Sequence, residues 1–279
     1  MKPAPFDYLR PDSLDQALDA LSRAGEEARI LAGGQSLGAM LNMRIVTPAL
    51  VVDINRLAGL DRIETQIDRT MTPALVRQAD ALKDAGIRNN VPLLALALPH
   101  VGHYQTRNRG TLCGSAAHGD PSAEIPLVLA TLNGEVELKS RKRTRRIRAR
   151  DFWRAALTTA RDPDECVVAL YWPNSSPTAR YAFREFSIRE GDFAVVAVAC
   201  SIDCGKVALG FGGCGDAPQV VECTLTDPLS AGDIASHAAK KIECRSDPFA
   251  HADYRRHLAF VLAKQALSDV LSENGQHHA

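Results

Sequence analysis

A pair of adjacent glycines near the N-terminus, Gly33-Gly34, limits most strongly what this chain can fold into. They lie in the run LAGGQSL at 31–37, between a strand-like segment at 28–32 and a helix-like segment at 37–43. Glycine tolerates positive φ and lets a ligand approach the backbone closely. A helix that follows such a turn presents free N–H groups and the positive end of its dipole. The pattern predicts a strand, a tight turn and a helix that bind a phosphate or pyrophosphate.

A second stretch of small residues has the same character. It reads RGTLCGS at 109–115 and continues as AAHGDPSAE at 116–124. It too precedes a helix-like segment, so its backbone could approach a ligand in the same way. Two such loops could bind one elongated dinucleotide from two sides.

Two further glycine motifs compete with this interpretation. Residues 34–38 form Gly-x-Ser-x-Gly, the pattern around the nucleophile of serine hydrolases, which leaves a hydrolase using Ser36 as an alternative. That fold places several strands and an oxyanion loop before the nucleophile, and few residues precede Ser36 here. Residues 210–215 form Gly-x-Gly-x-x-Gly, but a proline and β-branched residues follow, so a turn between strands is expected rather than a dinucleotide fingerprint.

The charged residues and the histidines give no sign of a nucleic-acid or metal site. The chain carries 33 Lys and Arg and 33 Asp and Glu, so its formal net charge is zero. Eight basic residues lie between Lys139 and Arg150, and a solvated hairpin with Ile147 and Ala149 turned inward is expected there. The histidines at 100, 103 and 118 lack the paired spacing of a zinc site.

Cysteine usage and hydropathy indicate a cytoplasmic protein. The seven cysteines, at 113, 166, 200, 204, 214, 223 and 244, form no Cys-x-x-Cys pair. An odd, scattered set favours reduced thiols and argues against an iron–sulfur cluster in this chain. The first residues lack the apolar core of a signal peptide, and no apolar run is long enough to span a membrane.

Hydrophobic periodicity and turn residues predict a mixed pattern of helices and strands. Helices are expected at 14–24, 72–86, 92–98, 121–132 (with Asp120 as N-cap) and 252–273, the last with Leu258, Val261, Leu262 and Leu271 on one side. Strands are expected at 28–32, 51–54, 180–187, 193–203 and 206–212, and a hairpin at 135–147. A frayed tail is expected at 274–279. The turn formers at 172–177 are the best candidate for a domain boundary.

Three motifs in order resemble one family. They are AGGQSL at 32–37, Thr111-x-x-Gly114-Ser115 with Asp120-Pro121-x-x-Glu124, and REGDFA at 189–194. With this order and spacing, the chain resembles the FAD-binding medium subunit of molybdenum hydroxylases, the carbon monoxide dehydrogenase and xanthine dehydrogenase family. The resemblance runs from residues 6–8 to the last helix.

The resemblance implies a fold and a division of the chain. The fold class is α+β, with a two-lobed FAD-binding domain of the PCMH/vanillyl-alcohol-oxidase-like type and a smaller α+β C-terminal domain. The FAD-binding domain is expected at 1–175, with lobes of about 1–55 and 56–175. The C-terminal domain is expected at 178–279, with a small sheet packed on helices.

The resemblance also implies which residues contact FAD, and it assigns no catalytic residue to this chain. The cofactor-binding positions are Ala32, Gly33, Gly34, Gln35, Ser36, Leu37, Gly102, Thr111, Gly114, Ser115, Asp120, Glu124, Val167 and Arg184. Arg184 or Glu185 falls where related chains often carry a lysine near the flavin. Cys113 stands where the family usually has glycine, and Phe193 where many members have tyrosine. Leucine in place of Gly34 or Gly114 is expected to abolish FAD retention with the fold intact.

The resemblance finally implies an incomplete enzyme. FAD would receive electrons from [2Fe-2S] clusters of a partner and pass them to an external acceptor. The expected partners are a small [2Fe-2S] subunit and a large molybdopterin subunit, as a dimer of heterotrimers. A serine hydrolase and a non-enzymatic scaffold subunit are the alternatives, and both would be colourless proteins.

Overall fold

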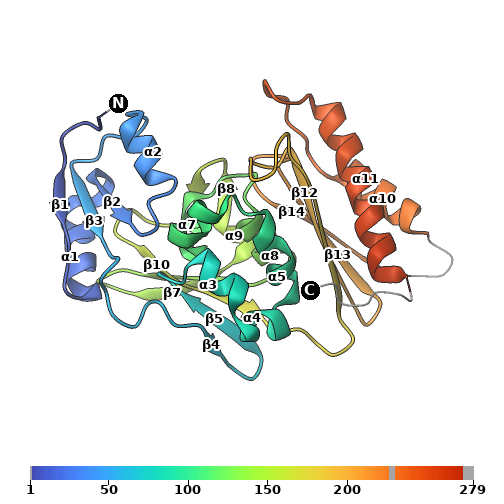
Figure 1. Cartoon of the computed structure of the whole chain (residues 1–279), viewed down its shortest axis with the longest axis horizontal. Coiled ribbons are helices and arrows are strands. Elements are labelled where there is room, and N and C mark those ends of the chain that lie inside the picture. The colour runs from blue at the N-terminus through green and yellow to red at the C-terminus, as the bar shows by residue number, and fades with distance from the viewer. Residues whose placement is uncertain (1, 226–229, 273–279) are drawn as a thin grey trace.

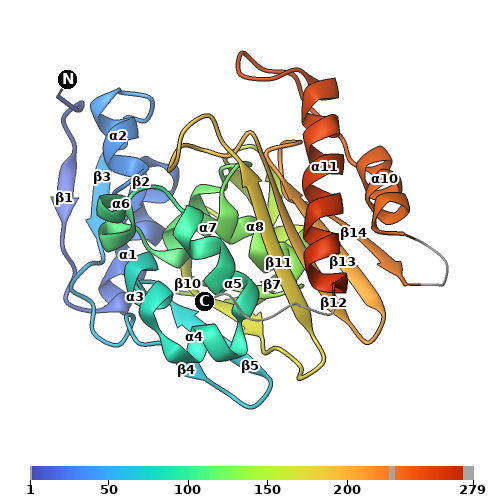
Figure 2. The same ribbon diagram turned by 45° about the vertical axis from the view of Figure 1, so that its right-hand side comes forward.

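Three principal sheets follow one another along the chain, with helices between and beside them (Figures 1 and 2). The structure is a computed structural model that describes residues 2–225 and 230–272. The first two sheets form two lobes, and the third forms a smaller α+β domain. The expected fold class is confirmed.

The N-terminal lobe is a small parallel sheet covered by one amphipathic helix. Its strands are β1 (Asp7–Leu9), β2 (Ala28–Leu31) and β3 (Leu50–Asp53), in the order β1-β3-β2. Helix α1 (Leu14–Ala24) and the 3₁₀ turn η1 (Gly25–Glu27) connect β1 to β2. Leu18 and Leu21 of α1 are fully buried, and the Ser13 hydroxyl caps the helix by accepting a hydrogen bond from the Gln16 N–H at 3.2 Å. Helix α2 (Leu37–Asn42) follows the first glycine loop.

The central lobe is a five-stranded antiparallel sheet covered by short helices. The sheet order is β4-β5-β10-β6-β7, with β4 Glu64–Thr65, β5 Arg69–Pro73, β6 Glu135–Lys139, β7 Thr144–Arg148 and β10 Cys166–Pro173. The helical segments are α3 Gln78–Lys83, α4 Ala85–Asn90, α5 Pro92–Ala97, η2 Leu98–His100, α6 Tyr104–Arg109, α7 Leu112–His118, α8 Glu124–Thr131 and α9 Ala149–Phe152. A two-stranded ribbon, β8 (Trp153–Ala155) with β9 (Thr158–Thr159), completes the lobe.

Two of the expected helices begin in the wrong place, because tertiary pairing and a local turn overrule the capping pattern. Thr72 and Pro73 belong to β5, where Thr72 pairs with Leu170 and its hydroxyl accepts a hydrogen bond from the Trp172 indole N–H at 2.9 Å. The region expected as one helix at 72–86 therefore holds a strand and then α3 and α4. Asp120 does not cap a helix at 121–132. Its carboxylate accepts from the Ser122 N–H at 2.8 Å in a turn, and α8 starts at Glu124.

The C-terminal domain is an antiparallel meander between two layers of helices. Its strands are β11 (Arg180–Phe186), β12 (Val196–Asp203), β13 (Lys206–Gly212) and β14 (Gln219–Thr224). Helices α10 (Ala231–Lys241) and α11 (Ala252–Leu271) cover one face, while α5 and α8 of the central lobe pack against the other (Figure 2). Because both faces are covered, residues 196–200 of β12 are buried without alternation.

Glycines of the 210–215 motif allow this contact between domains. A Cβ on Gly210 would lie 1.9 Å from Thr131 Oγ1, and one on Gly212 would lie 3.1 Å from Leu127, both on α8. The expected turn between strands is found after Gly212, and β14 follows. These glycines serve close packing of a helix on a strand.

The last helix confirms its expected start, and its buried face only partly matches the expected one. The buried residues of α11 include Leu262, Ala263, Ala266 and Leu267, whereas Leu271 is exposed. The tail expected to fray, 274–279, lies outside the described residues. No helix in the described part of the chain is long and apolar enough to cross a membrane.

Candidate functional site

One cavity of about 690 Å³ collects both glycine loops. It lies between the N-terminal and central lobes, and the loop 191–193 before β12 also lines it. Among the expected site residues, thirteen line this cavity: Ala32, Gly33, Gly34, Gln35, Ser36, Leu37, Gly102, Thr111, Gly114, Ser115, Asp120, Glu124 and Val167. Side chains far apart in sequence therefore meet around one space.

The first loop is shaped by its two glycines in different ways. Gly34 has a φ of 73°, a conformation that favours glycine. At Gly33 a Cβ would lie 2.6 Å from the Arg109 carbonyl oxygen and 2.8 Å from Gly110 Cα. Gly33 is thus required for contact between the two loops. Ser36 stands at the N-cap position of α2, without a side-chain capping bond.

The second loop is held by its own cap and by an arginine from a neighbouring helix start. The Thr111 hydroxyl accepts a hydrogen bond from the Gly114 N–H at 2.9 Å, which fixes the first turn of α7. Arg77 donates to the Arg109 carbonyl and, at 2.6 Å, to the Asn55 side-chain oxygen. Asn55 follows β3, so this arginine joins the N-terminal lobe to the second loop.

Glu124 is a buried carboxyl group that lines the cavity. Glu124 is the first residue of α8, and it is 6% exposed. Burial is the main cause that raises its pKa to about 7, and the neighbouring Asp120 acts in the same direction while Arg107 opposes it. The pKa of His118 is lowered by burial, with Asp120 opposing. The cavity therefore holds a carboxyl group that changes charge near neutral pH.

Arg184 does not line the cavity. Its guanidinium forms an ion pair with Asp269 of α11, with nitrogen–oxygen distances of 2.6 and 2.8 Å. The neighbouring Glu185 points to the other side of β11, as strand alternation requires. The expectation that Arg184 contacts the cofactor is therefore corrected: this side chain is engaged on the far face of the sheet.

The positions that depart from the family pattern lie at the cavity. Cys113 is buried on α7, its thiol donates to the Thr72 carbonyl at 3.5 Å, and burial raises its pKa. Phe193 lines the cavity and is 68% exposed. The aromatic ring thus stands at the mouth of the cavity without a hydroxyl group.

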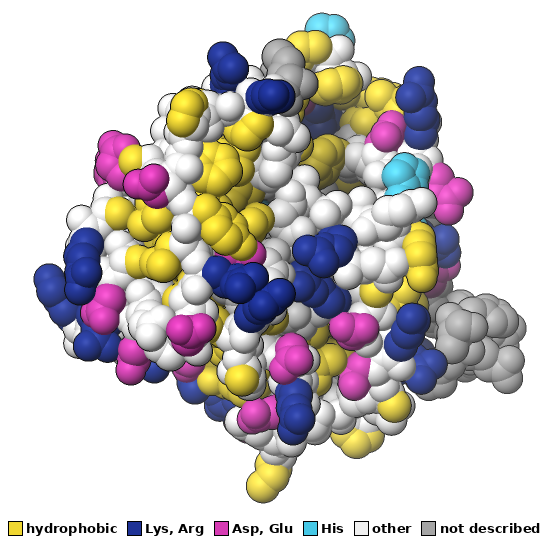
Figure 3. Space-filling model, turned by 60° about the vertical axis from the view of Figure 1, so that its left-hand side comes forward, with side chains coloured by type: hydrophobic (Ala, Val, Ile, Leu, Met, Phe, Trp, Pro, Cys, Tyr) yellow, Lys and Arg dark blue, Asp and Glu magenta, His cyan; other side chains and the backbone are white. Residues whose placement is uncertain are grey.

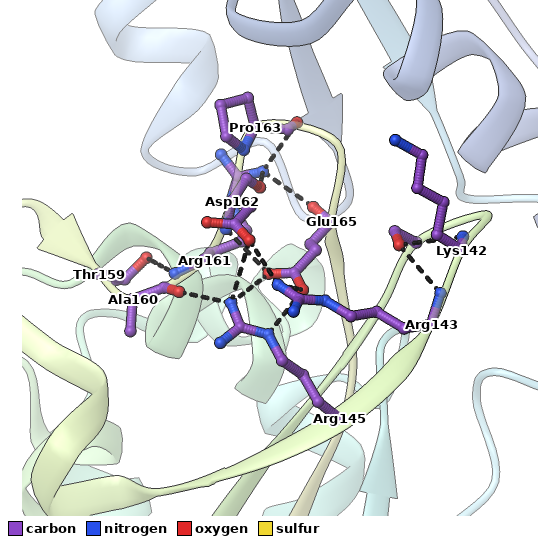
Figure 4. Close-up of polar contacts among 10 residues, drawn as sticks. Lys142, Arg143, Arg145, Thr159, Ala160, Arg161, Asp162, Pro163 and Glu165 are labelled. Atoms are coloured by element: carbon purple, nitrogen blue, oxygen red, sulfur yellow. Dashed lines mark hydrogen bonds and ion pairs between the residues drawn. The ribbon is translucent and has the colours of Figure 1, made fainter.

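The basic hairpin is engaged in ion pairs rather than free to bind a polyanion. Arg145 of β7 forms two hydrogen bonds of 2.7 Å with the Glu165 carboxylate, whose side chain is 1% exposed (Figure 4). Arg143 pairs with Asp162 at 2.6 Å. Arg161, the residue before Asp162, lines the cavity. On the face that brings the N-terminal lobe forward, acidic and basic side chains are interspersed (Figure 3). These contacts favour the expected structural role of the hairpin.

Other candidate sites find no support in the described residues. No group of His, Cys, Asp and Glu within 2–225 and 230–272 is arranged to hold a metal ion. Sequence reasoning missed Arg77 and Asn55, which fix the second loop. It recognised the 189–194 motif but assigned no cofactor contact to Gly191 or Asp192, which line the cavity. Gly191 has a φ of 81°, so the glycine was a usable signal.

Two family models cover nearly the whole chain. Residues 4–175 match the FAD-binding domain in molybdopterin dehydrogenase, and residues 181–270 match the carbon monoxide dehydrogenase flavoprotein C-terminal domain.

Relatives and solved structures agree with these matches. The chain is 35% identical to the 6-hydroxypseudooxynicotine dehydrogenase complex subunit alpha of Paenarthrobacter nicotinovorans, covering 97% of this chain and 96% of that one. It is 33% identical to the glyceraldehyde dehydrogenase medium chain of Sulfolobus acidocaldarius, covering 97% and 100%. A structure of quinoline 2-oxidoreductase from Pseudomonas putida 86 superposes with a TM-score of 0.90 at 30% identity, covering 97% and 98%. The chain therefore belongs to the family of FAD-binding medium subunits of molybdenum hydroxylases, which includes carbon monoxide dehydrogenase medium chains.

Proposed function

We propose that this chain binds one FAD, without a covalent link, in the cavity between its lobes, and acts there as the electron-transfer subunit of a molybdenum hydroxylase. The observation that carries the proposal is the meeting of two glycine loops, from different lobes, at one cavity of about 690 Å³. Such a volume is typical of sites for cofactors and small ligands. FAD supplies the electron chemistry when bound, and the protein supplies binding, orientation and electrostatics.

The residues present fit such a group. Gly34 and its neighbours leave the backbone uncovered, so N–H groups of residues 32–37 can face a pyrophosphate. Thr111, Gly114 and Ser115 of the second loop line the same cavity with small side chains. Val167, which is 5% exposed on β10, supplies an apolar wall. Glu124 places a titratable carboxyl group at the same cavity.

Partners are required if the chain relays electrons. A metal-binding cluster of side chains is lacking among the residues that the structure describes. We therefore propose a complex with a small [2Fe-2S] subunit, the electron donor, and a large molybdopterin subunit, assembled as a dimer of heterotrimers. The seven cysteines are free thiols, which supports a cytoplasmic location.

The test is native purification of the complex, followed by an absorption spectrum of the tagged chain. We expect a yellow protein with one FAD per chain, released by denaturation, and co-purification of two partners that carry iron and molybdopterin. A colourless chain that added FAD cannot restore would contradict the cofactor proposal. A flavin-containing monomer without a cluster-bearing partner would contradict the complex.

The same preparation separates the alternatives. A serine hydrolase would be colourless and labelled by a fluorophosphonate at Ser36, and a scaffold subunit would be colourless and unlabelled. Ser36 stands at the N-cap position of α2, a place where serine is common for structural reasons.

A further inference from the structure

Gln78 is a buried polar residue beside the second glycine loop. It is the first residue of α3, it is 4% exposed, and it lines the cavity. Its backbone N–H donates to the Gly110 carbonyl at 2.9 Å, and the Leu112 N–H donates to the Val76 carbonyl at 3.2 Å. The segment before α3 therefore pairs with the second loop, and this pairing fixes Gln78 next to Gly110.

The Gln78 side chain packs on Gly110 at the point where the two glycine loops meet. A Cβ on Gly110 would lie 2.6 Å from Gln78 Oε1 and 2.9 Å from its Cδ. On the side of the first loop, a Cβ on Gly33 would lie 2.8 Å from Gly110 Cα. Gly33, Gly110 and Gln78 are thus packed in sequence, which places the carboxamide at the junction of both loops.

Packing of the protein does not explain why this residue is polar. Gln78 Oε1 is buried and has no hydrogen-bond partner among the described residues. Buried polar atoms in proteins are nearly always paired, and an unpaired one is unfavourable. An apolar side chain of the same length would fill the space without this cost. The carboxamide therefore has a role beyond the fold of the chain.

The orientation of the carboxamide leaves its NH₂ group for the cavity. Its oxygen faces Gly110, and the nitrogen of a planar carboxamide points away from the oxygen. Residues 32–37 and 110–115, which supply the cavity-lining parts of both loops, carry no charged side chain. Phosphates bound there depend on N–H donors, and a hydrogen bond to an ionised acceptor is stronger than one between neutral groups.

We propose that the Gln78 side-chain NH₂ group donates a hydrogen bond to a phosphate oxygen of the FAD pyrophosphate, and that Gln78 thereby positions the cofactor between the two loops. This inference rests on the proposed function. It adds a side-chain donor from α3 to the backbone N–H groups of the first loop.

The experiment is a fluorescence titration of the flavin-free full chain with FAD. Because a hydrogen bond to a charged group is lost, we expect Gln78→Met to raise the FAD Kd about ten- to a hundredfold. Gln78→Glu should raise it further, since it places a carboxylate beside the phosphates. Gln66→Met makes the same chemical change at an exposed position between β4 and β5, and it should leave the Kd unchanged.

Two further measurements separate this contact from a structural role. Flavin-free Gln78→Met should unfold at the wild-type temperature or above it, because it removes an unpaired buried polar atom at similar side-chain length. ADP carries a pyrophosphate without the flavin, so its Kd, measured by competition with FAD, should rise in Gln78→Met as well.

The outcomes distinguish the contact from the site. An unchanged FAD or ADP Kd in Gln78→Met, or a lower melting temperature of that flavin-free variant, overturns the role of Gln78 alone. Tighter FAD binding by Gln78→Glu than by Gln78→Met also overturns it, because a carboxylate can accept from a cofactor hydroxyl but cannot donate to a phosphate. A wild-type chain that binds no FAD overturns the proposed function itself.

Discussion

Two glycines at the cavity are required for different reasons, one for its backbone conformation and the other for the space beside it. Gly34 adopts a φ of 73°, so any side chain there strains the turn. A Cβ on Gly114 would lie 2.7 Å from Thr111 Oγ1, the group that caps α7. The expectation that leucine at either site leaves the fold intact is therefore revised, because both changes disturb the loop itself.

A cleaner test of the first loop uses Ser36. Aspartate and asparagine are both good N-cap residues and nearly equal in size, so Ser36→Asp and Ser36→Asn should both preserve α2. Since aspartate adds a negative charge where a pyrophosphate is proposed to bind, we expect the FAD Kd to rise at least tenfold, about 1.4 kcal/mol. Ser36→Asn should bind far more tightly than Ser36→Asp. Fluorescence titration of the flavin-free chain measures both, and equal affinities would remove the pyrophosphate from this loop.

At the scale of elements, α8 packs closely against β13 because glycines on the strand leave room for the helix. Gly210→Ala places a methyl group 1.9 Å from Thr131 Oγ1, and overpacking of this kind costs about 1–3 kcal/mol. We expect a lower Tm for Gly210→Ala, and partial recovery in the double variant with Thr131→Ala, which removes the oxygen. Thermal unfolding of the four chains gives the coupling between the two sites. Additive effects would show that the helix moves away freely.

The hairpin of β6 and β7 is held to the segment before β10 by a buried charge. Arg145→Ala would leave the Glu165 carboxylate, 1% exposed, without its two-bond partner. Removal of one partner from a buried pair costs about 3–5 kcal/mol, reduced here because the Arg145 side chain is 28% exposed. Arg141→Ala, whose partners Asp15 and Asp19 are exposed, should cost about 1 kcal/mol or less. Comparable losses in chemical unfolding would contradict this ranking.

At the scale of the whole molecule, the C-terminal sheet is shared between two cores. Ala197 and Ala199 of β12 belong to the large core that includes α5 and α8, while Val196, Val198 and Cys200 belong to the core with α10 and α11. We expect a chain cut after residue 175 to expose apolar surface on α5 and α8. It should bind a hydrophobic dye and unfold at lower temperature than the full chain. A monodisperse fragment with an unchanged Tm would show that the two parts are independent.

The sequence alone determined the local features with short-range causes. The helix expected at 14–24 forms as α1, the strand at 28–31 leads into the glycine loop, and the helix expected at 92–98 begins at Pro92. These features depend on neighbours within a few residues, so the residue pattern contains the reason. The resemblance then supplied the family and thirteen of the residues around the cavity.

The tertiary structure decided what depends on distant partners. Thr72 and Pro73 look like a helix start but form a strand, because β10 pairs with them. Arg184 pairs with Asp269 of α11, whereas Glu185, the next residue, lies on the other face of β11 with its Oε2 buried. Gly33 meets Arg109 and Gly110 from the other lobe. Such contacts join residues many positions apart. Their energy comes from burial and close packing between distant segments, so the pattern of neighbouring residues does not predict them.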